Sequence, residues 1–167
     1  MIDSPRKQSD GIGKICLVRP PAVESFRFVT TTITLPLGLA YVAAVLEQDG
    51  RDVHILDSVA ESPKTKTRYY KGVLVGLSLE EIASRIPDDA TMVGITVIFT
   101  HEWPAVVRLV ELIRVRRPDI TVILGGEHIT SMPEFCLATS DANFIVCGEG
   151  EETVSYTHLT LPTNREV

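Results

Sequence analysis

The feature that most constrains the fold is an alternation of short runs rich in β-branched residues with segments of helical length. Five apolar runs have the length of strands, and they cover residues 14–20, 52–57, 91–99, 120–126 and a stretch that begins at residue 143. Strands separated by helices imply parallel βαβ units, and near-continuous apolar strands imply a sheet covered on both faces. The sequence therefore predicts an α/β fold, a flavodoxin-like or Rossmann-like doubly wound parallel five-stranded sheet.

Cap signals mark several of the predicted helices. A helix in residues 35–50 has a suitable C-terminal stop at Gly50, and Ser78 and Glu81 have the spacing of a capping box. In the next predicted helix, 103–118, the apolar residues fall on one face, and Trp103 at its start is expected to lie in the core.

The remaining connections are less regular. A short helix is predicted over residues 132–140, whereas residues 58–75 read as a polar connection with little pattern. The loop over residues 22–35 is longer than a simple turn, and loops of this length are usually functional or mobile.

Composition excludes several classes of partner. The 167 residues suit one domain, and the net charge of −6 comes without a dense Lys/Arg stripe, so no nucleic acid is expected to bind. No apolar run approaches the roughly 20 residues of a membrane span, and the N-terminus lacks the apolar stretch of a signal peptide. These observations predict a cytoplasmic protein with no membrane partner.

The three cysteines are too widely spaced for a disulfide framework or a zinc site. Cys16 and Cys147 lie inside apolar runs, where small core residues are expected, and Cys136 is the third. No CxxxCxxC motif occurs in the chain.

The two ends of the chain differ from the rest. Residues 1–13 are polar and are interpreted as a flexible leader, and residues 14–153 as the domain. Residues 154–167 (VSYTHLTLPTNREV) have no helical face and resemble a translated sequencing adapter, which predicts a non-native read-through tail in which His158 has no role.

Glycines, hydroxyls and histidines follow the predicted strands, where ligands bind in such sheets. They come after the third, fourth and fifth strands, as FTHEWP (99–104), GGEHIT (125–130) and GEGEE (148–152). Glycines leave no side chain between backbone and ligand, and two pairs at neighbouring strand ends favour a broad ligand over ordinary turns. The GxG at Gly11 precedes the first strand, and no P-loop occurs, so a dinucleotide fingerprint is absent.

At this point a family resemblance becomes specific. The ordered segments VRPP, PLGLAYVAAVLEQDGRDVHILD, VGITVIFTHEWP, GGEHITSMPE and GEGEET resemble the N-terminal cobalamin-binding domain of B12-dependent radical SAM enzymes, over about residues 14–153. The resemblance implies that a corrinoid lies across the carboxyl edge of the sheet, with its benzimidazole tail passing the glycines. The implied cofactor-binding residues are Thr96, Thr100, His101, Gly125, Gly126, Glu127, His128, Gly148, Glu149 and Gly150.

The resemblance also bears on the cobalt ligand. Cobalamin domains of mutases and methionine synthase have an Asp-x-His-x-x-Gly loop after the first strand, whereas this chain has RPPAVESFRF, without histidine. The implied state is base-off cobalamin with no histidine on cobalt, so no protein metal ligand is predicted. His101 and His128 stay open as alternatives to that assignment, and His54 is interpreted as a structural strand residue.

The resemblance finally implies what lies outside this chain. Catalysis in such enzymes needs a C-terminal radical SAM domain that holds a [4Fe–4S] cluster on three closely spaced cysteines and binds S-adenosylmethionine. The chain alone is therefore expected to bind cobalamin without catalysis, as part of a methyltransferase-like parent. Two alternatives remain: a free-standing corrinoid carrier or sensor, and a flavodoxin-like domain that binds flavin or another nucleotide. Acidic residues such as Glu127 and Glu149 at the strand ends disfavour the phosphate of a flavin nucleotide.

Overall fold

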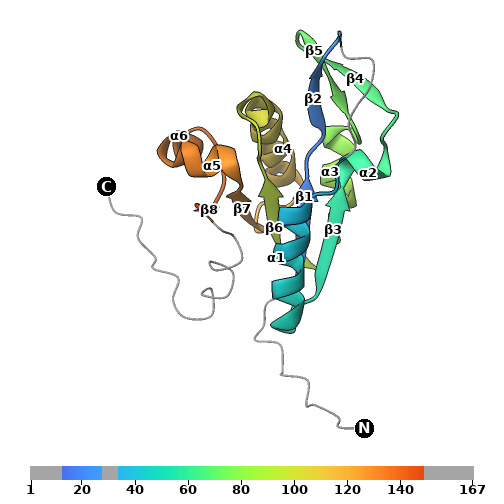
Figure 1. The fold of residues 1–167 in the computed structure, drawn as a ribbon. Coiled ribbons are helices and arrows are strands. Elements are labelled where there is room, and N and C mark those ends of the chain that lie inside the picture. Colours follow the sequence, from blue (N-terminus) through green and yellow to red (C-terminus); the bar gives the residue numbers. More distant parts are fainter. Residues whose placement is uncertain (1–12, 28–33, 149–167) are drawn as a thin grey trace.

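The main sheet has five parallel strands. The structure, a computed structural model, describes residues 13–27 and 34–148. The strands of this sheet are β1 (Lys14–Arg19), β3 (Val53–Asp57), β6 (Ala90–Thr96), β7 (Thr121–Gly125) and β8 (Phe144–Val146). They lie in the order β3-β1-β6-β7-β8 (Figure 1). The chain starts in the middle of the sheet, builds outward to β3 and then reverses to β6, which is the flavodoxin-like order. The predicted fold class is confirmed.

One face of this sheet is covered by helices from the second half of the chain. These are α3 (Leu79–Arg85), α4 (Trp103–Arg116), α5 (Glu127–Ser131) and α6 (Pro133–Ala138). Their buried side chains, including Ile82, Leu109 and Ile113, join Val93 and Leu124 of the strands in one large apolar cluster. Trp103 belongs to this cluster with 6% of its surface exposed, which confirms its predicted place in the core.

The second face is covered by α1 (Leu37–Gln48), which lies in front of the sheet in Figure 1. Three residues of α1, Leu39, Ala43 and Leu46, pack on Ile15 and Leu17 of β1. The predicted stop at Gly50 is confirmed: the helix ends at Gln48, and Gly50 follows with φ 78°, a left-handed conformation that favours glycine. Because α1 packs mainly over β1 and β3, coverage of this face is uneven, unlike the full coverage expected from the sequence.

A second, three-stranded antiparallel sheet was not predicted. Its strands, β2 (Ala22–Ser25), β4 (Lys66–Tyr69) and β5 (Gly72–Val75), lie in the order β2-β5-β4 at the upper right of Figure 1. The interpretation of residues 58–75 as a plain connection is wrong, because they form α2 (Ser58–Glu61) and the β4–β5 hairpin. The start of the loop over residues 22–35 is likewise a strand, and residues 28–33 lie outside the described part.

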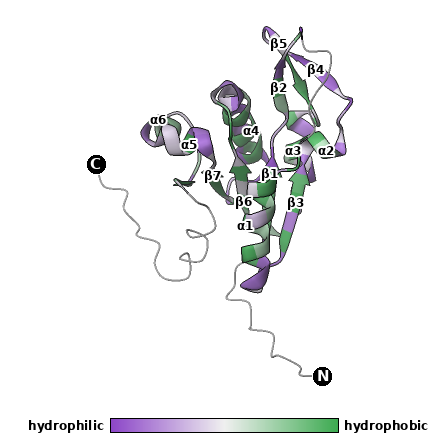
Figure 2. Cartoon of the chain, in the orientation of Figure 1, coloured by the Kyte–Doolittle hydropathy of each residue, from purple (hydrophilic) through white to green (hydrophobic). Residues whose placement is uncertain are grey.

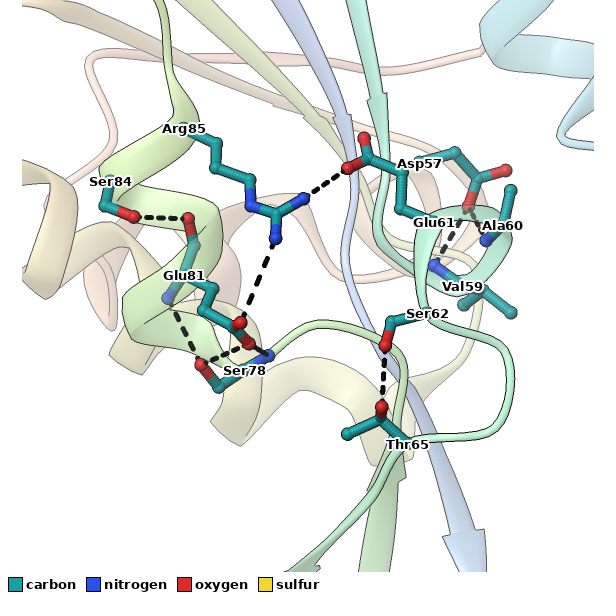
Figure 3. Close-up of polar contacts among 10 residues, drawn as sticks. All are labelled: Asp57, Val59, Ala60, Glu61, Ser62, Thr65, Ser78, Glu81, Ser84 and Arg85. Atoms are coloured by element: carbon teal, nitrogen blue, oxygen red, sulfur yellow. Dashed lines mark hydrogen bonds and ion pairs between the residues drawn. The ribbon is translucent and has the colours of Figure 1, made fainter.

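Figure 3 shows the polar contacts that fix the elements around this hairpin. The Asp57 carboxylate accepts hydrogen bonds from the backbone N–H groups of Val59 and Ala60 and so caps α2. Ser78 and Glu81 form the predicted capping box at the start of α3, with both reciprocal hydrogen bonds in place. These caps satisfy N–H groups that a helix end leaves free.

Two details of the described residues differ from expectation. Strand β6 ends at Thr96, earlier than the predicted end at residue 99, because the chain then turns into the short helix η1 (Thr100–Glu102). Cys147 is exposed at the end of the edge strand β8, so its predicted place in the core is wrong, whereas Cys16 and Cys136 are buried.

Within the described residues, no helix reaches the length and apolar character that a membrane span requires.

Candidate functional site

The predicted site residues gather at the carboxyl edge of the sheet. Thr96 ends β6, Gly125 ends β7, and Gly148 follows β8, with Thr100 in η1 close by in sequence. These strands are adjacent, and Thr96 lies opposite Gly125, which in turn lies opposite Val146. The remaining described members of the set are His101 in η1 and Gly126, Glu127 and His128 at the start of α5. Glu149 and Gly150 lie outside the described residues.

The strand register shows which face of the sheet these residues share. Side chains alternate along a strand, and Ile95 and Leu124 point into the large core. The residues between and beside them therefore point to the other face, toward the side of α1. We call the part of this face over β6, β7 and β8 the open face; it comprises Gly94, Thr96, Ile123, Gly125, Phe144 and Val146.

The open face is only partly covered in the described structure. None of its residues is fully buried, and Phe144 is 39% exposed. The buried apolar residues of α5 and α6, Ile129 and Cys136, belong to the core on the opposite face. Small residues line the open face near the carboxyl edge. Their side chains project little from the sheet, so a ligand could approach the backbone there.

The two adjacent glycines have different structural reasons. Gly126 has φ 110°, and a Cβ there would lie 2.6 Å from the backbone oxygen of Val97. Gly125 and His128 also make backbone hydrogen bonds with Val97, which holds the two chains close. A Cβ on Gly125, by contrast, would meet only Val146, at 3.7 Å. Gly126 is thus required by the fold itself, while Gly125 leaves space on the open face.

His128 lies inside the protein. It is 2% exposed, its Nδ1 lies 3.2 Å from the Thr100 hydroxyl, and Nε2 has no hydrogen-bond partner in the described structure. Its ring lies 5.3 Å from the ring of Trp103, whose Nε1 donates to Thr139. Thr100 is exposed, so the hydroxyl joins the buried imidazole to the surface of the carboxyl edge.

The loop between β6 and α4 presents flat groups to solvent. The rings of Phe99 and His101 are stacked with centroids 5.3 Å apart, and both residues are exposed. The loop is held by Glu102, which accepts a hydrogen bond from the Phe99 N–H. Burial raises the pKa of the Glu102 carboxyl above its ordinary value. Glu127, in contrast, is exposed in the first turn of α5.

Sequence reasoning missed an apolar rim around this edge. Seven large apolar residues there are at least 42% exposed: Leu35, Leu37, Tyr41, Ile98, Phe99, Met132 and Phe135. They come from the start of α1, the loop after β6, and α5–α6. Large apolar side chains that are exposed beside strand ends are typical of a binding surface. These residues differ from exposed residues of ordinary loops only in their position in the folded chain, which the sequence alone does not give.

At the end of β1, Arg19 occupies the region expected for a histidine loop. Its guanidinium donates to the backbone oxygen of Thr34, at 2.6 Å, and pairs with the Asp57 carboxylate at 3.3 Å. Both charged side chains are about 85% buried, with 15% and 13% of their surfaces exposed. This pair joins β1, β3 and the entry to α1 at the carboxyl edge of the sheet.

The described residues offer no obvious centre for a metal ion. Over residues 13–27 and 34–148, no three His, Cys, Asp or Glu side chains gather at one point. Burial raises the pKa of the Cys16 thiol to about 12, so it stays protonated and is a poor ligand at neutral pH.

Comparison with known proteins identifies the family of this chain. Residues 27–156 match the B12 binding domain family. The chain belongs to this family. The B12-binding domain found here is 34% identical over 150 residues to cytidylyl-2-hydroxyethylphosphonate methyltransferase of Streptomyces wedmorensis, a match that covers 84% of this chain and 27% of the relative. It is 30% identical over 156 residues to an uncharacterised methyltransferase of Pyrococcus horikoshii, covering 92% and 30%. The chain thus spans less than a third of each relative.

Solved structures support the fold of the B12-binding domain. A cobalamin-binding protein from Desulfitobacterium hafniense superposes with a TM-score of 0.58 at 15% identity, covering 87% of this chain and 57% of that one. A CheY-like protein (tadZ) from Pseudomonas aeruginosa superposes with a TM-score of 0.52 at 14% identity, covering 86% and 96%. At these identities the likeness concerns the fold alone.

Proposed function

We propose that this domain holds cobalamin with the corrin ring over the carboxyl edge and the benzimidazole tail against the open face. The observation that supports this placement most directly is Gly125. It ends an inner strand, a Cβ there would meet only Val146 at ordinary contact distances of 3.7 and 3.8 Å, and it faces the incompletely covered side of the sheet. Thr96 lies beside it and Gly148 one strand away, so small or hydroxyl-bearing groups border the same space.

The apolar rim fits the upper part of the same ligand. A corrin ring is broad and has methyl groups as well as amides at its edge. Leu37, Phe99 and Phe135 would contact the methyl groups, and Thr100, His101 and Glu127 would hydrogen-bond the amides. A small, enclosed ligand would need a deep pocket instead of an exposed rim.

For the lower face of cobalt we propose base-off cobalamin without a histidine ligand. The segment after β1 contains no histidine, and Arg19 is committed there to Asp57 and Thr34. His128 is buried beneath Thr100 and beside Trp103, so its imidazole faces the core. His101 is exposed but stacks on Phe99.

We further propose that the parent protein is a radical SAM enzyme of methyltransferase type. Both curated relatives are methyltransferases by name and are much longer than this chain. In this proposal a C-terminal domain supplies the [4Fe–4S] cluster and S-adenosylmethionine, while this domain binds and orients the corrinoid. Bound cobalamin supplies the cobalt chemistry, and the protein supplies position and environment. The domain limits 14–153, and a read-through tail over 154–167, remain part of this proposal; residue 14 begins β1, and residues 149–167 lie outside the described part of the chain.

The decisive experiment compares two cofactors. Purified chain is titrated with hydroxocobalamin and, separately, with flavin mononucleotide, and absorbance after gel filtration reports what stays bound. We expect one equivalent of cobalamin to remain and no flavin. Retention of flavin with loss of cobalamin would support the nucleotide-binding alternative and overturn the proposal.

The ligand assignment has its own test. We expect His101→Ala and His128→Gln to leave the absorption spectrum of bound cobalamin unchanged, because neither imidazole reaches cobalt. Glutamine is chosen at position 128 since it keeps a polar contact with Thr100 in a buried site, where alanine would leave a cavity. A shifted spectrum in either variant, with unaltered thermal stability, would identify that histidine as a ligand.

A further inference from the structure

The β4–β5 hairpin is the most basic part of the described structure. Residues 64–71 (KTKTRYYK) contain Lys64, Lys66, Arg68 and Lys71 and no acidic residue, although the chain has a net charge of −6. All four cations are exposed, and Figure 2 shows hydrophilic β4 in contrast to the hydrophobic strands of the main sheet. None of the ion pairs among the described residues includes Lys66 or Arg68.

The outer side of β4 has free backbone groups. Among residues 13–27 and 34–148, the order β2-β5-β4 leaves strand β4 paired on one side only. The Gly76 N–H donates to the Thr65 oxygen, so these two residues form a hydrogen-bonded pair of the ladder. Such pairs alternate along an antiparallel ladder. Lys66 and Arg68 therefore direct their N–H and C=O groups away from β5, toward the free edge.

The hairpin is fixed at its base and strained at its tip. The hydroxyls of Ser62 and Thr65 lie 2.6 Å apart (Figure 3), and the Leu77 N–H donates to the Ser58 oxygen. At the tip, Tyr70 has φ 48° and is 80% exposed. A non-glycine residue in this conformation costs about 1–3 kcal/mol, and such strain is often found where a ligand binds.

A groove of about 520 Å³ adjoins the end of β4. It lies between the hairpin and the outer face of α4, and its lining residues are Arg68, Tyr69, Tyr70, Pro104, Val107, Arg108 and Glu111. Arg108 and Glu111 pair across its rim at 2.7 Å. The groove is wide open, whereas sites for small molecules enclose most of their ligand. An open groove beside a free strand edge suits a polypeptide better than a small anion.

We propose that β4 binds an extended acidic segment of another polypeptide, which adds to the three-stranded sheet as a further strand. The backbone of the segment would pair with Lys66 and Arg68, and its carboxylates would lie beside their side chains. Charged residues on an edge strand normally prevent pairing with other chains. Here they discriminate, because a basic strand is repelled, a neutral one gains no charge attraction, and an acidic one is attracted.

The test uses a fluorescent peptide of alternating glutamate and threonine, with a glutamine–threonine peptide as its neutral match. Fluorescence anisotropy with the full chain should show binding of the acidic peptide only. Arg68→Glu should raise its Kd at least about 10-fold, and Arg68→Lys should change it less than about 3-fold. The control is Arg116→Glu, an exposed reversal at the other end of α4, which should change the Kd less than about 2-fold.

A backbone test separates strand pairing from simple charge attraction. The acidic peptide is N-methylated at alternate residues in two registers. Only the register that places methyl groups against β4 should lose binding, and hydrogen exchange at Lys66 and Arg68 should slow when the unmodified peptide binds. Equal binding of both methylated peptides, or an equal loss in Arg116→Glu, would overturn the proposal. Cobalamin binding by the Arg68 variants is expected to be unchanged. A negative result with the peptide can therefore be distinguished from a negative result in the cofactor titration.

Discussion

Gly125→Val is expected to abolish tight cobalamin binding while leaving the domain folded. Valine suits a strand, and its Cβ would contact Val146 at the ordinary distance of 3.7 Å. The added methyl groups would fill the space on the open face where the benzimidazole tail is proposed to lie. We expect the affinity for hydroxocobalamin to fall at least about 100-fold, equivalent to about 2.7 kcal/mol, with the melting temperature within about 3 °C of the original protein.

The matched control is Thr121→Val. Thr121 lies on the same strand and the same face as Gly125, but at the amino end of β7. This variant should bind cobalamin as the original protein does. If Gly125→Val also binds normally at an unchanged melting temperature, the tail does not lie against this face, even if the family's cofactor binds elsewhere on the edge.

Gly126→Ala should show the opposite behaviour, a loss of stability with or without cofactor. Its Cβ would lie 2.6 Å from the oxygen and 3.0 Å from the nitrogen of Val97, and both are backbone atoms that cannot move aside cheaply. The φ of 110° adds strain for any residue with a side chain. We expect a loss of about 3 kcal/mol in the free energy of unfolding and about 10 °C in melting temperature.

Gly50→Ala separates the two causes of that loss. Gly50 also has a positive φ, 78°, but a Cβ there would have no atom within 4 Å. Its substitution should cost only about 1 kcal/mol, from backbone strain alone. Equal melting temperatures for the Gly126 and Gly50 variants would show that the approach of Val97 does not restrict position 126.

The main sheet was predictable because its strands are long apolar runs separated by helices. Periodicity and cap residues give such elements directly, as for α1 and its stop at Gly50. The small sheet was missed because β4 (Lys66–Tyr69) is an exposed edge strand with no apolar alternation. Its stability comes from pairing with β5, which a reading of local pattern cannot detect.

The candidate site was predictable only as a set of strand ends. The strand-end glycines and hydroxyls are at the predicted edge, but the depth of each side chain was not evident. His128 and Glu127 are neighbours in sequence, yet one is buried against Trp103 and the other is exposed. Their difference depends on how the five-residue helix α5 packs, and so short a helix has no periodic pattern to reveal its inner face.

The edge position of β8 has a thermodynamic consequence for any molecule that sits beside it. A three-residue strand that pairs, within the described part of the chain, only with β7 should fray well before the centre of the sheet unfolds. A ligand that rests on Gly125 and Val146 at once would bridge the two strands and suppress that fraying. Part of its binding free energy would then be spent on ordering β8, so tightening this strand pair would strengthen affinity without touching the ligand.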